Sequence, residues 1–144
     1  MLDAYVEHKQ LGYVGQETVL VALTRNDYLP DICFFGKEKA TLLVEDQMKF
    51  PPSDFVVEVL SPSTADKDRG EKMLDYATHG VQEYWLVDPE AQVVEQYGLV
   101  LGEGREENGR FALLLKLKTG TLTSHVINGF TIPVEAIFDK SIKN

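Results

Sequence analysis

Residues 55–60, Phe55-Val56-Val57-Glu58-Val59-Leu60, form a run of β-branched and large apolar side chains with one carboxylate set into it. Proline and serine residues bound the run on both sides, as Pro51-Pro52-Ser53 and Ser61-Pro62-Ser63. This pattern is typical of a central strand in a sheet whose two faces are both covered. An ionised glutamate in such a strand is costly unless it is paired or bound to a cation. Glu58 is therefore either a functional acid or a residue that reaches the strand end and meets water or a basic partner.

The composition indicates an ordinary globular chain. Of the 144 residues, 44% are hydrophobic and 26% are charged, so one domain spanning residues 1–144 is predicted. Cys33 is the only cysteine, which excludes an internal disulfide and a cysteine-based zinc cluster. The N-terminus lacks the pattern of a signal peptide, and no apolar stretch is long enough to span a membrane. We therefore expect a cytoplasmic protein that does not associate with membranes.

The net charge of −9 bears on possible nucleic-acid partners. It argues against avid, unspecific binding, because neutralising phosphates normally needs a basic surface. It does not exclude an enzyme that acts on nucleic acid through a bound cation, since the cation neutralises its acidic ligands locally.

The order of predicted elements indicates an α/β (α+β) domain with a mixed central sheet and one main crossover helix. The helix is expected from about Ala65 to His79, after an N-cap at Ser63 or Thr64, and Gly80 ends it. Because it connects two strands within 40 residues, those strands are expected to be parallel. The other expected elements are a short helix over 2–10, strands over 17–23, 32–35, 83–87, 93–97 and 111–117, and a closing turn or short helix after 131–134.

Two carboxylates, Asp31 and Glu58, stand at the edge or interior of predicted core strands. Asp31 follows Pro30, which favours an extended entry into the strand over 32–35. Alone, it is more readily interpreted as an aspartate that caps a turn. If the two strands are neighbours, both carboxylates could converge on one divalent ion. Oxygen ligands of this kind suit Mg²⁺ or Mn²⁺ better than zinc.

The predicted crossover helix contributes Lys72, which lies four residues from both Asp68 and Tyr76. Lys72 is on the flank of the apolar face of the helix. Its amine could swing towards the sheet, or it could be solvated and paired with Asp68. The histidines are scattered and no nucleophile elbow or glycine-rich phosphate loop occurs, which argues against a zinc enzyme, a serine hydrolase and a phosphate-loop protein.

Three strings of residues carry a resemblance to a known family. They are Tyr28-Leu29-Pro30-Asp31, then Glu58-Val59-Leu60-Ser61-Pro62-Ser63-Thr64 with Asp68, Lys72 and Tyr76, and then Gly80-Val81-Gln82-Glu83-Tyr84-Trp85-Leu86-Val87-Asp88-Pro89. Together they resemble the Uma-two (Uma2) family of restriction endonucleases, placed in the PD-(D/E)XK nuclease superfamily. The resemblance covers roughly residues 11 to 140.

The resemblance implies a restriction-endonuclease-like fold and a metal-dependent endonuclease that hydrolyses DNA. Asp31 and Glu58 match the two acidic ligands of a Mg²⁺ or Mn²⁺ ion, which would polarise the scissile phosphate and activate water. The motif lysine would stand at Leu60, and Lys72 is the candidate that replaces it as a catalytic residue. The resemblance also implies a homodimer, and it implies that most of the family's N-terminal helix and hairpin is missing from this chain.

The alternative from another class is a catalytically inactive nuclease-fold protein that serves as an interaction or regulatory module. Leu60 at the lysine position, the shortened N-terminus and the acidic charge balance all favour it.

Overall fold

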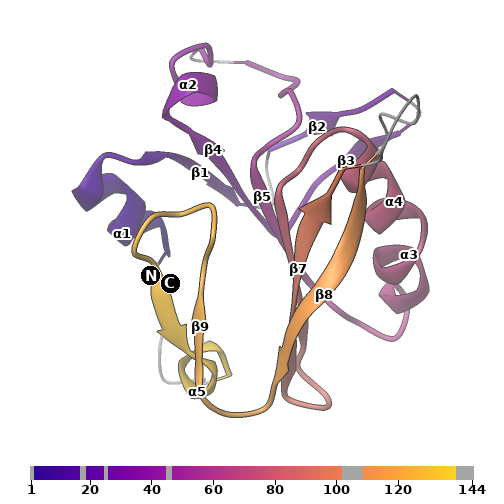
Figure 1. The fold of residues 1–144 in the computed structure, drawn as a ribbon. Coiled ribbons are helices and arrows are strands. Elements are labelled where there is room, and N and C mark those ends of the chain that lie inside the picture. The colour runs from indigo at the N-terminus through magenta and orange to yellow at the C-terminus, as the bar shows by residue number, and fades with distance from the viewer. Residues whose placement is uncertain (1, 17–18, 25, 45–46, 102–108, 139–144) are drawn as a thin grey trace.

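A six-stranded mixed sheet forms the centre of the computed structural model, which describes residues 2–16, 19–24, 26–44, 47–101 and 109–138. The strand order is β1-β4-β5-β6-β7-β8, and only β5 and β6 are parallel (Figure 1). The bounds are β1 (Gly12–Gln16), β4 (Ile32–Gly36), β5 (Phe55–Val59), β6 (Glu83–Asp88), β7 (Val93–Val100) and β8 (Arg110–Leu117). The predicted fold class and the predicted parallel pair are confirmed.

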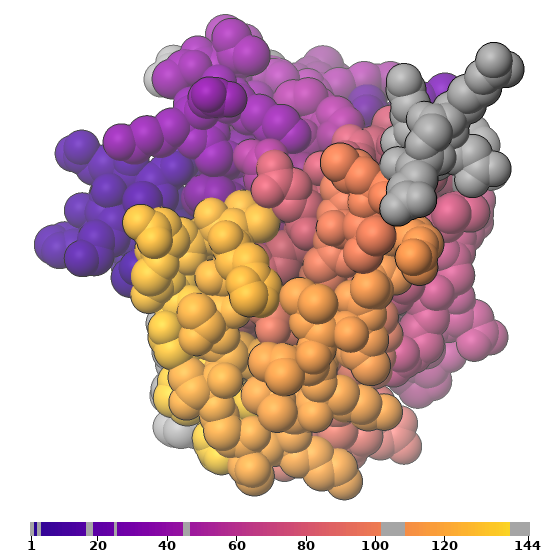
Figure 2. Space-filling view, viewed as in Figure 1, coloured from indigo at the N-terminus to yellow at the C-terminus, as the bar shows by residue number. Residues whose placement is uncertain are grey.

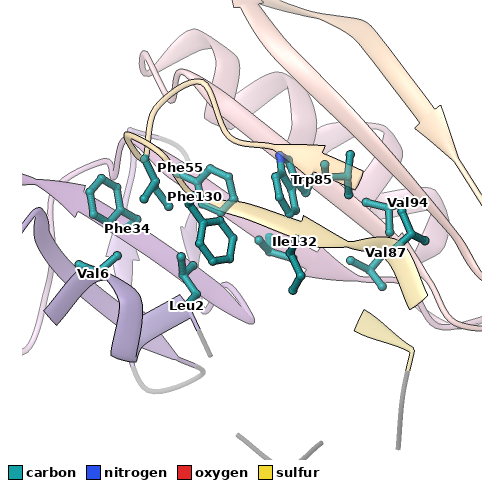
Figure 3. Packing of buried hydrophobic residues seen from close by; sticks show 13 residues of the cluster. Leu2, Val6, Phe34, Phe55, Trp85, Val87, Val94, Phe130 and Ile132 are labelled. Carbon is teal, nitrogen blue, oxygen red and sulfur yellow. The ribbon is translucent and has the colours of Figure 1, made fainter. Parts of the chain in front are cut away.

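Strand β5 is covered on both faces, as its sequence predicts. Its residues 55–58 are buried, and only Val59 at the end is exposed. Phe55 and Val57 pack into a cluster with Trp85 and the C-terminal segment, part of which Figure 3 shows. Alternate residues point to opposite faces of a strand, so the even-numbered positions of β5 face the crossover helices.

The crossover between β5 and β6 contains two helices, α3 (Ala65–Arg69) and α4 (Glu71–Thr78). The prediction of one helix from about Ala65 to His79 is therefore wrong at Gly70, where the backbone turns out of the helical region (φ −109°, ψ −101°). A Cβ atom at this position would lie 2.9 Å from the carbonyl oxygen of Asp66. Glycine tolerates this close approach, which is why the break falls there.

The N-terminal part contains α1 (Leu2–Lys9), which confirms the predicted short helix, and strand β1, which was not predicted. Strand β1 contains two glycines, which weaken a strand signal. A Cβ atom at Gly12 would lie 2.0 Å from the carbonyl oxygen of Phe35 in the neighbouring strand, so a side chain has no room there. Of the strand predicted over 17–23, only β2 (Val21–Ala22) forms, paired with β3 (Asp27–Tyr28), and positions 17 and 18 lie outside the described residues.

The C-terminal segment covers the face of the sheet opposite α3 and α4 (Figure 1). It contains β9 (Thr121–Thr123), β10 (Thr131–Pro133) and α5 (Val134–Ile137), so the predicted closing helix is confirmed, and a short helix α2 (Lys37–Ala40) follows β4. In Figure 2 the yellow C-terminal residues lie between the indigo N-terminal residues and the orange strands. The Tyr5 hydroxyl donates to the carbonyl oxygen of Asn128 at 2.7 Å, which joins the two ends of the fold.

Buried Glu83 fastens this segment to the sheet. One carboxylate oxygen accepts hydrogen bonds from the Ser124 hydroxyl and from the backbone N–H groups of His125 and Val126, at 2.8 to 3.0 Å. The other accepts from the Trp85 indole and the Gln96 amide. With both oxygens saturated, Glu83 has a structural role.

Among the described residues, no helix is both long enough and apolar enough to cross a membrane.

Replacing Phe55 with alanine should destabilise the protein by about 3 to 5 kcal/mol, because the side chain is fully buried and its ring packs edge-on against Trp85 at 5.2 Å between centroids. Val59→Ala in the same strand is the matched control and should cost less than about 1 kcal/mol, since Val59 is 44% exposed. Urea unfolding of the three proteins measures both free energies. Similar losses for the two variants would contradict a core centred on β5.

Candidate metal centre

The fold brings Asp31 and Glu58 together at one end of the sheet. Strands β4 and β5 are antiparallel, and Ile32 pairs with Val57, so Asp31 lies beside Glu58. The Asp31 backbone N–H donates to Glu58 Oε1 at 3.0 Å, and the Val59 backbone N–H donates to Asp31 Oδ2 at 2.7 Å. Each carboxylate is thus oriented by the backbone of the other acid's strand.

Glu58 is an acid held inside the protein, with only 1% of its side chain exposed. Its Oε2 atom accepts from Lys72 Nζ at 2.9 Å. Burial raises the pKa of Glu58 to about 7, although the nearby Lys72 ammonium and the Asp31 N–H both lower it. Near neutral pH, the carboxyl is therefore balanced between its charged and neutral forms.

Lys72 reaches this site from α4. Its amine points towards the sheet, where Nζ contacts Glu58 Oε2, and Nζ also lies 3.1 Å from Asp68 Oδ1, so the predicted pairing with Asp68 forms without the predicted solvation. Burial lowers the pKa of Lys72, but the contacts with Glu58 and Asp68 raise it by a larger amount. The net shift of the Lys72 pKa is therefore upward. The lysine therefore stays an ammonium ion in a site where only 16% of its side chain is exposed.

A wall of tyrosine rings explains why Glu58 is poorly hydrated. The rings of Tyr28, Tyr76 and Tyr84 follow one another at 5.4 and 5.8 Å between centroids, and all three side chains are buried. Lys72 Nζ lies 5.6 Å from the centre of the Tyr28 ring, within range of a cation–π contact. The wall keeps water from Glu58 on the side of the crossover helices.

Asp68 and Tyr28 were not among the predicted site residues. Asp68 could have been included, because in the single helix predicted over 65–79 its spacing of four from Lys72 makes the two side chains neighbours. Tyr28 lies three residues before Asp31, at the end of β3, but nothing in the sequence indicated that its ring would contact Lys72.

The donor set at this site suits a divalent cation that prefers oxygen. Mg²⁺ is usually held by one or two carboxylates, with water and substrate phosphates as the remaining ligands. Asp31 and Glu58 can supply those two carboxylates, because the hydrogen bonds between their strands hold both side chains at the same end of the sheet. Within the described ranges, no group of three or more histidine, cysteine, aspartate or glutamate residues could enclose a metal by itself. The residues therefore fit Mg²⁺ or Mn²⁺ and do not form a structural zinc site.

The sequence model of the Uma2 family, described as "Putative restriction endonuclease", matches residues 1–135 of the chain. The chain belongs to the Uma2 family.

A solved structure shares the fold. It is a crystal structure from Anabaena variabilis described as "a putative nuclease belonging to DUF820", with a TM-score of 0.66 and 18% sequence identity. The similarity covers 95% of this Uma2 chain and 73% of the Anabaena chain. No curated protein matches this chain. The fold and the family are thus shown, while the roles of Asp31, Glu58 and Lys72 stay predictions.

This Uma2 chain has a buried leucine where the motif lysine is expected. Leu60 is 6% exposed and packs with Val56 and the tyrosine wall. The ammonium group next to Glu58 comes instead from α4, through Lys72.

Replacing Glu58 with glutamine should remove a pH-dependent cost of folding. Because the folded-state pKa of Glu58 is raised from 4.5 to about 7, the protonated acid favours the folded state, and that stability is lost as the pH rises through this window. Between pH 5 and pH 8, the metal-free wild type should therefore lose roughly 2 kcal/mol relative to Glu58→Gln. Urea unfolding at several pH values measures the difference.

The exposed Glu90, changed to glutamine, is the control and should show no such trend. A difference between wild type and Glu58→Gln that stays constant from pH 5 to pH 8 would show that burial does not shift the Glu58 pKa.

Proposed function

We propose that this Uma2 chain is an endonuclease dependent on Mg²⁺ or Mn²⁺ that hydrolyses DNA phosphodiester bonds. Asp31 and Glu58 are the metal ligands, and Lys72 is the third catalytic residue. The observation that carries the proposal is the meeting of these three side chains from β5, α4 and the segment before β4 at one end of the sheet. The family description and the nuclease-like fold support it.

The divalent ion, when bound to Asp31 and Glu58, would supply charge neutralisation at the scissile phosphate and activation of water for in-line attack. The chain's own groups prepare the site. The backbone N–H of Asp31 holds one Glu58 oxygen, and the N–H of Val59 holds one Asp31 oxygen, so both carboxylates are oriented in advance. The Lys72 ammonium would stabilise the negative charge that develops on the phosphate.

Purified protein should nick supercoiled plasmid in the presence of Mg²⁺ or Mn²⁺, and a chelator should abolish the reaction. Asp31→Asn and Glu58→Gln should each reduce the rate by about 100-fold or more, because each removes a ligand of the cation. Asp66→Asn is the matched control, since Asp66 is an exposed acid on α3 and should leave the rate unchanged within about twofold. Undiminished cleavage by the two site variants would mean that another site or a contaminant cuts the plasmid.

Lys67 is a candidate for contacting the DNA backbone at the edge of the site. Its side chain is exposed on α3, and its Nζ lies 6.0 Å from the centre of the Tyr28 ring, the same ring that Lys72 contacts. Because the chain as a whole is acidic, an exposed lysine close to the Tyr28 ring would contribute strongly to positioning a phosphate.

Lys67→Ala should weaken DNA binding at all sequences alike and should reduce the slope of log affinity against log salt by about 1. The control is Lys37→Ala, because exposed Lys37 follows the end of β4 remote from Asp31. Fluorescence anisotropy between 50 and 200 mM salt, in Ca²⁺ to prevent cleavage, gives both slopes. Equal slopes for wild type and Lys67→Ala would remove Lys67 from the interface.

A second candidate function is a nuclease-fold module that binds a partner without cutting DNA. The observation that favours it is that each Glu58 oxygen already accepts a hydrogen bond, one from the Asp31 N–H and one from Lys72. Calorimetry separates the candidates, because the module would bind no Mn²⁺ whereas the nuclease would. A homodimer and a cytoplasmic location stay predictions for either candidate.

A further inference from the structure

Lys72 lies between two buried acids, and its contacts with them are unequal. Its Nζ atom donates a hydrogen bond to Glu58 Oε2 at 2.9 Å. Asp68 Oδ1 is almost as close, at 3.1 Å, yet this buried oxygen accepts no hydrogen bond from any described group. The side chain of Asp68 is 3% exposed, so it has little access to water. An acceptor with unused capacity therefore lies directly beside the ammonium group.

A divalent cation on Glu58 would compete with Lys72 for the same oxygen. Like charges at such short range repel each other strongly in a poorly hydrated site. Without another partner, Lys72 would then be a buried charge with no counter-ion, which is costly. Metal uptake at Glu58 therefore needs an acceptor that keeps the ammonium in place.

We propose that Asp68 is a positioning residue that takes over the Lys72 ammonium when Glu58 binds the cation. A small rotation of the lysine completes the hydrogen bond to Asp68 Oδ1 and releases Glu58 Oε2. Lys72 then stays at the site as a cation, next to the position of the phosphate. This inference rests on the proposed function, because it assumes that Glu58 is a metal ligand.

The surroundings of Asp68 suit a fixed acceptor. The Tyr84 hydroxyl donates to the carbonyl oxygen of Asp68 at 2.9 Å, which ties this turn of α3 to the sheet. The N–H of Asp68 donates to Thr64 within the same turn. The break at Gly70 separates Asp68 from Lys72, so the acid belongs to a helix of its own. The backbone of the acid is anchored, and the long lysine side chain supplies the movement.

A double-mutant cycle read by Mn²⁺ affinity tests this inference without relying on catalysis. The proteins are wild type, Asp68→Asn, Lys72→Met and the double variant, titrated with Mn²⁺ at pH 8 by calorimetry after circular dichroism has verified folding. Asp68→Asn should weaken Mn²⁺ binding by about 10-fold in the wild-type background. In the Lys72→Met background the same change should cost less than about twofold, because no ammonium remains to be held.

Two further variants keep the result interpretable. Lys72→Gln replaces Lys72→Met if the apolar variant does not fold. Asp66→Asn removes an exposed acid two residues from Asp68 on the same helix and measures the effect of net charge alone, which should stay below about twofold.

The outcomes separate this inference from the proposed function. Equal losses from Asp68→Asn in both backgrounds would mean that Asp68 acts by its own charge, which overturns the inference and leaves the metal site standing. An unchanged affinity in Asp68→Asn would overturn it as well. If the wild type binds no Mn²⁺, the metal site proposed for Asp31 and Glu58 fails, and the role of Asp68 fails with it.

Discussion

The burial of the Glu58 carboxylate against Lys72 is the interaction on which the site depends. The acid lies in the central strand with 1% of its side chain exposed, and it can be charged there only because the lysine and the backbone of Asp31 meet its oxygens. The same contact fastens α4 to the sheet. Arg69 on α3 forms a parallel contact with both oxygens of Glu95 on β7, so two ion pairs fix the crossover helices. The position of Lys72 thus follows from the packing of α3 and α4 against the sheet.

The fold contains a second fully buried glutamate, and the comparison shows what distinguishes a site from a structural acid. Glu83 accepts five hydrogen bonds from neutral groups and holds the C-terminal segment. Glu58 accepts two, one of them from the Lys72 ammonium group, and lies beside the partly exposed Asp31. We propose that Lys72, which has an alternative partner in Asp68, lets Glu58 exchange its lysine contact for a cation. Glu83 has no comparable freedom.

The features with a strong local signal could be predicted from the sequence. The apolar run around Glu58 predicted the central strand, and the Pro30-Asp31 step predicted an acid at the entry of another strand. That this acid meets Glu58 depended on the two strands being neighbours, which the sequence did not establish. The break at Gly70 could not be predicted, because an isolated glycine is tolerated inside many helices and the crowding by Asp66 exists only in the fold. Tyr28 was missed because long-range packing alone brings it to Lys72. The position of Lys72 on the flank of its helix left two orientations open, and in the fold the amine points to the sheet while it also lies close to Asp68.

The central claim is that Asp31 and Glu58 share one divalent cation at the end of β5. A crystal of the protein soaked in Mn²⁺ and measured for anomalous scattering tests it most directly. The account predicts one anomalous peak between the two carboxylates, at about 2.0 to 2.6 Å from an oxygen of each, with Lys72 Nζ turned towards Asp68. A site that stays free of Mn²⁺ at saturating concentration, with Lys72 still on Glu58, would contradict the claim.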